Sequence, residues 1–306
     1  MNFPGLGDDD FRAGFVAVVG RPNVGKSTLI NHFVGSKVSI VSPRPQTTRH
    51  RILGVVNRPG AQVIFIDTPG MHVGQKKAIN RVMNRTAVSA LAEAEVIVWI
   101  IEAGQWTALD QNVLQRLESV SQPVILAVNK TDLVSDKAAL LPFLNDISSR
   151  RELHAVVPVS ALRGDQTDAL MTEIEPLLPK SPAMFPPDMR TDRGDAFLVA
   201  EIVREKLTLR LRQELPYGLT VQVEQIKRDG ERLDIHAIIF VERSSQKGIV
   251  VGKGGNVLKA VGTSARRDIM RLLDTSVHLE LWVKVKENWA DSEQDLRRLG
   301  FDTDAG

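Results

Sequence analysis

Residues 20–27 read GRPNVGKS and match the pattern G-x-x-x-x-G-K-[ST], and no other feature of the chain constrains its fold as much. The apolar run GFVAVVG (14–20) leads into it, and a helix-compatible segment, 28–34, follows. Glycines permit the sharp turn that aims backbone N–H groups at phosphates, and the positive end of the next helix adds to that field. The motif predicts a strand, a phosphate-binding loop and a helix, with Lys26 on the β- and γ-phosphates and Ser27 on Mg²⁺. The rival interpretation is a strand, turn and helix with accidental glycines.

Short runs rich in Val and Ile alternate with longer amphipathic stretches through the first half of the chain. Continuous apolar runs are typical of strands buried on both faces, and long helical connections imply parallel pairing. We therefore expect an α/β domain with a doubly wound, mostly parallel sheet. The predicted strands are 14–20, 63–67, 96–101, 124–129 and 155–159, and the predicted helices are 26–34, 78–92, 110–120 and 165–178.

The chain of 306 residues suggests about two domains. Four prolines between 179 and 187 predict a stiff linker. Beyond it, a helix (197–213), two strands (219–226 and 232–241), a helix (256–273) and a strand (277–285) suit a small α+β domain. We expect a disordered extension at 1–11, a first domain at 12–179, a linker at 180–195 and a second domain at 196–306.

Two further motifs follow buried strands in the first domain. Asp67-Thr-Pro-Gly70 stands where the acidic residue of a Mg²⁺ shell belongs, and Gly70 lets a backbone N–H approach a γ-phosphate. By itself D-x-P-G also suits a surface turn. In Asn129-Lys-Thr-Asp132, the carboxylate of Asp132 can accept both N1–H and N2–H₂ of guanine, whereas adenine offers no donor there. The pattern therefore favours guanine, and the Ser160-Ala161 pair is expected to place a backbone N–H near its O6.

The segment Pro45-Gln-Thr-Thr-Arg49 predicts a switch loop in which Thr48 is the second Mg²⁺ ligand, with Thr47 as the alternative. The position after Gly70 holds Met71, which cannot orient an attacking water. His72 is better explained as a surface residue than as a base. In this respect the chain resembles the GTPases that carry an apolar residue at this position. The resemblance implies that the asparagine of the phosphate loop, here Asn23, helps to hold K⁺; a plain turn role for Asn23 is the rival interpretation. K⁺ activation predicts faster hydrolysis in K⁺ than in Na⁺.

Gly252-Lys-Gly-Gly255 forms a G-x-x-G loop between the apolar run 249–251 and a predicted helix. In KH domains such a loop clamps the backbone of about four nucleotides. Residues 243–286 carry nine basic and three acidic side chains, a net +6, although the whole chain is only +2. Positive charge gathered around the loop favours nucleic acid over an ordinary helix junction. The order α-β-β-α-β matches a type II KH domain, for which single-stranded RNA is the expected ligand.

The motifs at 20–27, 67–70, 129–132 and 160–161 resemble G1, G3, G4 and G5 of translation-factor-like GTPases. Together with the linker and the KH-like domain, they resemble the Era family of bacterial ribosome-assembly GTPases over about residues 12–301. This resemblance implies GTP hydrolysis with Mg²⁺, binding to the 3′ end of 16S ribosomal RNA, and a role in assembly of the small subunit. It also implies peripheral association with the inner membrane, which nothing in the sequence shows. The nucleotide contacts then expected are Gly20, Arg21, Pro22, Asn23, Val24, Gly25, Lys26, Ser27, Thr28, Asp67, Thr68, Pro69, Gly70, Asn129, Lys130, Thr131, Asp132, Ser160 and Ala161. The catalytic group is Asn23, Lys26, Thr48, Asp67 and Gly70, the metal ligands are Ser27, Thr48 and Asp67, and the RNA contacts are Ile249, Val251, Gly252, Lys253, Gly254, Gly255, Lys259 and Arg266.

Composition narrows the alternatives. The chain has no cysteine, which excludes disulfides, thiolate metal sites and the related tRNA-modifying GTPases, whose C-terminal catalytic Cys is missing. A relative with two tandem G domains is excluded because the phosphate-loop motif occurs once. An RNA-binding adaptor with a vestigial nucleotide site is disfavoured by the intact motif residues. No apolar run approaches the roughly 20 residues that span a bilayer. Together with the absence of cysteine this favours a cytoplasmic protein, and we separately expect a monomer.

Overall fold

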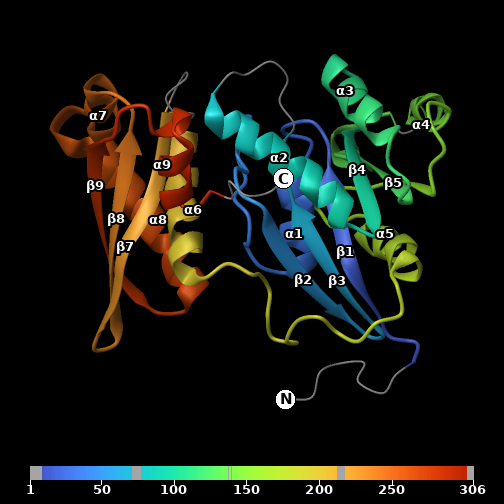
Figure 1. Ribbon diagram of the computed structural model, residues 1–306, viewed down its shortest axis with the longest axis horizontal. Helices are drawn as coiled ribbons and strands as arrows, with labels where there is room; N and C mark the ends of the chain where they lie inside the picture. Colours follow the sequence, from blue (N-terminus) through green and yellow to red (C-terminus); the bar gives the residue numbers. More distant parts are fainter. Residues whose placement is uncertain (1–8, 71–76, 137, 139, 212–217, 302–306) are drawn as a thin grey trace.

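The computed structural model describes residues 9–70, 77–136, 138, 140–211 and 218–301. Figure 1 shows two domains side by side, joined below by an extended segment and in contact along the helices that face each other. Each domain has its own hydrophobic core, as two units of this length can. None of the described helices combines the length and apolar character needed to span a bilayer.

The first domain is built on a six-stranded sheet in the order β2-β3-β1-β4-β5-β6. Every pairing is parallel except that of β2 with β3. The carboxyl ends of the parallel strands therefore meet at one edge, where ligands bind in this class of fold. The strands are β1 (Arg12–Val19), β2 (Ile52–Arg58), β3 (Ala61–Asp67), β4 (Val96–Glu102), β5 (Val124–Asn129) and β6 (Ala155–Pro158).

Helices cover both faces of this sheet. α1 (Lys26–Val34) and α5 (Thr167–Ile174) pack on one face, and α2 (Ala78–Glu93), α3 (Ala108–Leu117) and α4 (Leu140–Ser148) pack on the other. The predicted helix at 110–120 begins at Ala108 instead, because Thr107 and Asp110 form a capping box. The predicted helix at 165–178 is shorter, since a 3-10 turn with a proline (Glu175–Leu177) ends it. α4 was not predicted from the sequence.

Strand β2 is the main addition to the predicted sheet. Its ILGVVNR sequence lies directly after the switch segment, and Leu53 to Val56 are almost fully buried. A Cβ on Gly54 would come within 2.8 Å of Val34 and 2.9 Å of Ile30. Glycine at this position therefore allows α1 to cross the strand closely, a requirement that only the packed structure reveals.

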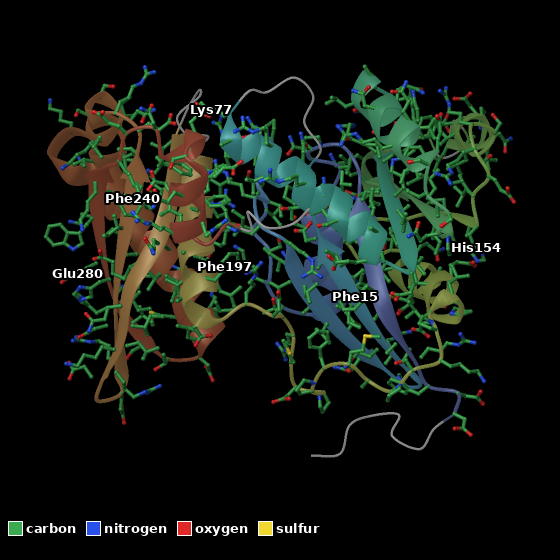
Figure 2. The ribbon with its side chains drawn as sticks, viewed as in Figure 1. Phe15, Lys77, His154, Phe197, Phe240 and Glu280 are labelled. Carbon is green, nitrogen blue, oxygen red and sulfur yellow. The ribbon has the colours of Figure 1, made fainter. Side chains whose placement is uncertain are left out.

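The second domain is a three-stranded sheet covered on one face by helices. β7 (Leu219–Asp229) is antiparallel to β8 (Arg232–Val241), and β9 (Ser276–Val285) is parallel to β8 and forms the other edge. The core contains residues of α6 (Asp195–Arg210), α7 (Ser244–Val251) and α8 (Asn256–Leu273). Figure 2 shows Phe240 and Glu280 on the side of the sheet away from the first domain.

Two predictions about this domain need correction. Residues 249–251 are not an apolar run of undefined structure but the end of α7, so the order is α-β-β-α-α-β and the G-x-x-G loop joins two helices. The chain then continues into a further unpredicted helix, α9 (Glu293–Arg298). It packs with α2 in a buried cluster of residues from both domains that includes Met83, Trp289 and Leu296.

The predicted stiff linker, residues 180–195, lies along the first domain. The N–H groups of Met184 and Phe185 donate to Oε1 of Gln62 at 2.7 and 2.9 Å. Further up the sheet edge, the Val55 N–H donates to the Arg190 carbonyl at 2.9 Å. Within the predicted extension 1–11, Phe11 is buried and its carbonyl accepts from the Ser181 N–H, so this residue is packed against the first domain and the linker. Residues 1–8 lie outside the described part.

Candidate functional site

The loop of residues 20–25 joins β1 to α1 and takes a conformation that requires its glycines. Gly20 and Gly25 have φ angles of 156° and 105°. A Cβ on Gly20 would lie 2.4 Å from the Ile100 carbonyl, and one on Gly25 would lie 2.2 Å from the Asn129 amide. The loop is therefore wedged between two neighbouring strand ends, with the N-terminus of α1 directly behind it.

Lys26 is the first residue of α1 and is 7% exposed. Its Nζ donates to the carbonyls of Gly20 and Arg21, both at 3.0 Å. Burial lowers the pKa of Lys26 to about 8, against the opposing attraction of Asp67. A buried ammonium satisfied only by carbonyls is well placed to exchange them for the anionic oxygens of a phosphate chain.

The three predicted metal ligands converge at the carboxyl end of β3. Asp67 is fully buried, and its Oδ2 accepts from Ser27 Oγ at 2.8 Å, Ser39 Oγ at 2.5 Å and Thr48 Oγ1 at 3.3 Å. Ser27 and Thr48 lie 3.0 Å apart. Burial raises the pKa of Asp67, and among the described residues its Oδ1 is buried without a hydrogen-bond partner. An orphaned carboxylate oxygen beside two hydroxyls fits Mg²⁺, which prefers oxygen ligands.

Thr47 and Thr48, the two candidates for the second Mg²⁺ ligand, differ in the groups that they contact. Thr47 Oγ1 bonds with Ser42 and donates to the Arg44 carbonyl, both at 2.6 Å, whereas Thr48 faces Asp67. Ser39 completes the hydroxyl cluster and was missed, because no local motif marks it. We therefore keep Thr48 as the proposed ligand.

The other residues predicted to contact phosphate lie around the same opening. Thr68 Oγ1 donates to the Val18 carbonyl at 3.1 Å, which holds the loop after β3 against β1. Gly70 lies over the phosphate loop, where an added Cβ would come within 3.3 Å of the Pro22 ring. A cavity of about 460 Å³ is lined by, among others, Pro22, Asn23, Gly25, Lys26, Ser27, Thr28, Thr48, Gly70 and Lys130. Met71 and His72 lie outside the described residues.

Asn129 connects the proposed base site to the phosphate loop. Its Nδ2 donates to the Val24 carbonyl at 2.7 Å, and its Oδ1 accepts from the Ala161 N–H at 2.9 Å. Ser160 Oγ donates to Asp132 Oδ1 at 2.6 Å, so the carboxylate is oriented from the neighbouring loop. The predicted motifs at 129–132 and 160–161 are thus brought together, although 28 residues separate Asp132 from Ser160.

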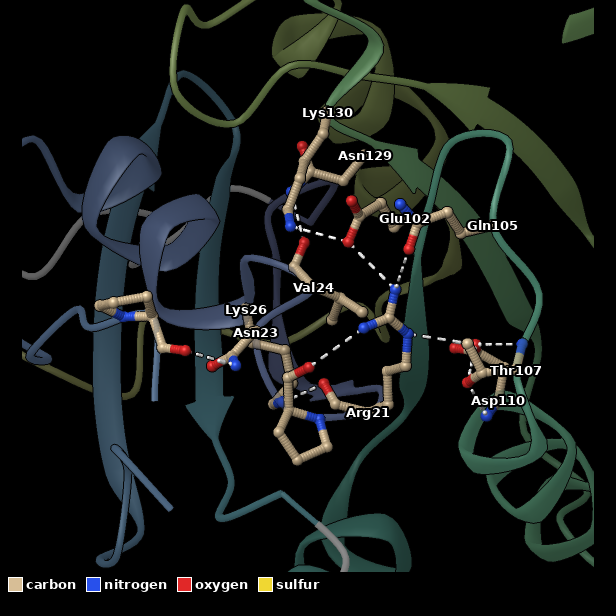
Figure 3. Close-up of polar contacts among 12 residues, drawn as sticks. Arg21, Asn23, Val24, Lys26, Glu102, Gln105, Thr107, Asp110, Asn129 and Lys130 are labelled. Carbon is tan, nitrogen blue, oxygen red and sulfur yellow. Dashed lines mark hydrogen bonds and ion pairs between the residues drawn. The ribbon is translucent and has the colours of Figure 1, made fainter. Parts of the chain in front are cut away.

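Two acidic residues support this edge and were not predicted. Arg21 bonds with Glu102 at 3.0 Å and with Asp110 at 3.1 Å, and Lys130 bonds with Glu102 at 2.8 Å (Figure 3). Burial alone would raise the pKa of Glu102, but Lys130 and Arg21 hold it below its usual value. Glu102 therefore binds both Arg21, in the phosphate loop, and Lys130, in the loop after β5, and connects the two loops. Asn23 has a φ of 66°, and its Nδ2 donates to the Pro43 carbonyl at 2.7 Å. Only its Oδ1 is then left to act as the proposed K⁺ ligand.

The G-x-x-G loop of the second domain adopts the left-handed backbone that glycine allows. Gly252, Gly254 and Gly255 have φ angles of 73°, 60° and 78°, and a Cβ on Gly252 would lie 2.5 Å from Val257. No atom would meet a Cβ on Gly254 or Gly255 within 4 Å. The loop is therefore open on its outer side, where Lys253 is exposed.

A groove of about 470 Å³ continues from this loop between α8 and β9. It contains the predicted Lys259 and Arg266, while Ile249 is exposed on α7 and Val251 packs toward the core. Thr263 could have been predicted, because it follows Lys259 at helical spacing; the residues from β9 have no such signal. The groove is lined by Gly255, Leu258, Lys259, Gly262, Thr263, Arg266, His278, Leu279 and Leu281.

The switch segment is in direct contact with α6 of the second domain. Glu205 accepts from the Val41 N–H at 3.1 Å through Oε1 and from Lys37 Nζ at 2.6 Å through Oε2. Arg204 donates to the Thr47 carbonyl, and Arg49 donates to the Leu219 carbonyl at 2.7 Å. The residues around Thr48 are therefore held by the second domain as well as by the first.

His50 is buried at the contact between the two domains. Its ring lies 4.3 Å from the Phe301 ring and meets the edge of Phe197, which points toward the first domain (Figure 2). Burial lowers the pKa of His50 to about 4, against the opposing charge of Glu201. The imidazole is thus neutral near pH 7 and packs as an aromatic ring.

Known proteins share both halves of this architecture. The family model described as a 50S ribosome-binding GTPase matches residues 15–130, and the KH domain model matches 214–290. The chain is 48% identical to the GTPase Era of Pseudomonas fluorescens (strain Pf0-1) over 290 residues, which cover 95% of this chain and 97% of that protein. The GTPase Era of Pseudomonas aeruginosa (strain LESB58) is also 48% identical, with 95% of each chain covered.

Two solved structures superpose over nearly the whole chain. One is Era in complex with MgGDPNP and nucleotides 1506–1542 of 16S ribosomal RNA, and the other is a point variant of Aquifex aeolicus Era bound to GDP·AlF₄⁻. Each has a TM-score of 0.92 and 40% sequence identity and covers 95% of this chain and 99% of that one. The chain matches a GTPase family model and a KH domain model, and it is 48% identical to GTPase Era over 95% of its own length. It therefore belongs to the Era family of GTPases.

Proposed function

We propose that this protein binds and hydrolyses GTP with Mg²⁺ and uses its KH domain to bind the 3′ region of 16S ribosomal RNA during maturation and assembly of the small ribosomal subunit. The observation that carries the proposal is the convergence of Ser27, Thr48 and the orphaned carboxylate oxygen of Asp67 beside a buried Lys26. The likeness to an Era structure with bound MgGDPNP and 16S RNA supports both halves of it.

The residues of this chain have separable tasks in hydrolysis. Lys26 and the loop N–H groups bind and orient the phosphates, and Ser27, Thr48 and Asp67 would hold Mg²⁺, which neutralises charge on the transferred group. Gly70 offers a backbone N–H toward the γ-phosphate. Asn23 as a K⁺ ligand, a monomeric state, a cytoplasmic location and contact with the inner membrane remain predictions.

RNA binding is tested at the G-x-x-G loop. We expect Lys253→Ala to weaken binding of the RNA spanning nucleotides 1506–1542 of 16S ribosomal RNA and to reduce the slope of log K against log salt by about one. The slope falls because one phosphate contact, with its released counterion, is lost. GTP affinity should not change. Fluorescence anisotropy at several salt concentrations measures both quantities.

A matched control is Lys227→Ala, on an exposed residue of β7 at a distance along the chain from the loop. It should leave both the affinity and the salt slope near those of the wild type. Equal slopes for Lys253→Ala and the wild type would contradict the assignment of the loop.

We further propose that nucleotide state and RNA binding are coupled through Glu205. Burial alone would raise the pKa of Glu205, but hydrogen bonds from Lys206 and Lys37 hold it below its ordinary 4.5. Lys206 also pairs with Asp268 on α8, the helix that carries the RNA groove. Glu205 thus accepts from the N–H of Val41, which lies just before the switch segment, and is connected through Lys206 to Asp268 on α8.

The expected result is a ratio of RNA affinities, non-hydrolysable GTP analogue against GDP, of about 5-fold or more in the wild type and near one in Glu205→Gln. Glu224→Gln, on the exposed part of β7, is the control and should keep the wild-type ratio. Because the folded pKa of Glu205 is lowered, its contribution to stability is complete above 4.5 and is lost as the pH falls through the folded pKa. The unfolding free energies of wild type and variant should therefore converge in acid. A wild-type ratio of one would contradict the coupling.

A further inference from the structure

Arg21 belongs to the phosphate loop, yet its guanidinium group is held by other protein groups. Its Nε donates to Asp110 Oδ2 at 3.1 Å, and its Nη2 donates to Glu102 Oε2 at 3.0 Å and to Gln105 Oε1 at 3.3 Å (Figure 3). Arg21 is not among the described residues that line the nucleotide cavity. Its side chain is therefore placed to fix the phosphate loop and not to bind a phosphate.

Glu102, the last residue of β4, brings two cations to a single oxygen atom. Its Oε2 accepts from Arg21 Nη2 at 3.0 Å and from Lys130 Nζ at 2.8 Å. The side chains of Arg21 and Glu102 are only 12% and 14% exposed, so water and salt screen this contact incompletely. Without the carboxylate the two like charges would repel each other, and of the links described above only the bond from Asn129 Nδ2 to the Val24 carbonyl would still join their loops.

Both cations belong to loops that would bind the nucleotide. Lys130 follows Asn129 in the loop after β5 and lines the same cavity as Lys26. The carbonyl of Arg21 accepts from Lys26 Nζ at 3.0 Å, so the place of Arg21 also sets the place of the phosphate-binding ammonium. The contact at Glu102 therefore fixes the spacing between the base loop and the phosphate loop.

We propose that Glu102 is a positioning residue that holds the base loop and the phosphate loop at the separation that one guanine nucleotide spans. A ligand that engages both loops at once gains from this fixed spacing, because the second contact is then made at a high effective concentration. A ligand that engages the phosphate loop alone gains little. This inference rests on the proposed GTP binding and adds how the two ends of the nucleotide site act together.

The test compares a ligand with a base and a ligand without one. Glu102→Gln keeps the size of the side chain and removes its charge, and it should weaken GDP binding by about 10-fold but ribose 5-diphosphate binding by less than about 2-fold. In a Lys130→Met background the same change should weaken GDP binding by less than about 2-fold, because the partner cation is already absent. Displacement of a fluorescent GDP derivative measures all of these affinities.

The matched control is Glu118→Gln, on an exposed acid at the end of α3, which should keep the wild-type affinity for both ligands. If Glu102→Gln weakens both ligands equally, costs as much in the Lys130→Met background, or keeps the wild-type affinity for GDP, the positioning role is refuted and nucleotide binding stands. If the wild type binds neither GDP nor GTP, the proposed function itself fails.

Discussion

Asp132→Asn is expected to lower GTP affinity by roughly 10³- to 10⁴-fold and to turn the preference toward xanthosine triphosphate. The carboxylate is oriented by Ser160 at 2.6 Å, and the proposed pose has it accept N1–H and N2–H₂ of guanine. An asparagine amide sets an N–H₂ donor against the donor at N2, so one polar group loses its partner. Xanthine has a carbonyl at that carbon, which can accept from the amide instead.

The measurement is the dissociation constant of each variant for the two triphosphates by displacement of a fluorescent nucleotide. Asp136→Asn, an exposed acid four residues further along, is the control and should keep the preference for GTP. Unchanged GTP affinity in Asp132→Asn would place the base elsewhere.

The second large effect is expected from Lys26→Met, which should reduce GTP turnover by about 10²- to 10³-fold and abolish stabilisation by nucleotide. The ammonium is the buried cation beside the phosphate loop, and methionine supplies its length without its charge. The variant should still fold, because it removes a charge whose burial lowers its pKa to about 8, which offsets the two hydrogen bonds lost to Gly20 and Arg21.

Phosphate release and the thermal shift on adding GDP check this result. At a GDP concentration 100 times its Kd, the wild type should gain about 2.7 kcal/mol of stability, and Lys26→Met should gain almost none. Lys180→Met, an exposed lysine paired with Asp10, should behave as the wild type does. If the wild type showed no GTP turnover, the alternative of an RNA-binding adaptor with a vestigial nucleotide site would be favoured instead.

Where the sequence predicted well, a local backbone requirement and a chemical role coincide in one motif. The loop 20–27 needs its glycines for positive φ angles and close contacts with neighbouring strands, so its pattern can be recognised in the sequence alone. The elements that the sequence did not predict depend on tertiary packing instead of on a local motif. Helix α7 contains Gly248, Ile249, Val250 and Val251, which have weak helix propensity, and packing against the sheet overrides that preference. Strand β2 was missed because it directly follows the switch segment and pairs antiparallel, outside the repeating pattern.

The sequence by itself determined the fold class, the nucleotide motifs, the guanine preference and the KH loop, because these rest on short motifs and on the alternation of apolar and amphipathic segments along the chain. Only the tertiary structure decided that Ser39 joins the Asp67 cluster, that Thr48 and not Thr47 faces it, and that Glu205 holds Val41 from the second domain. The physical reason is that burial, orphaned polar atoms and open space arise from segments that are distant in the chain, and their register is set by the packing of whole elements.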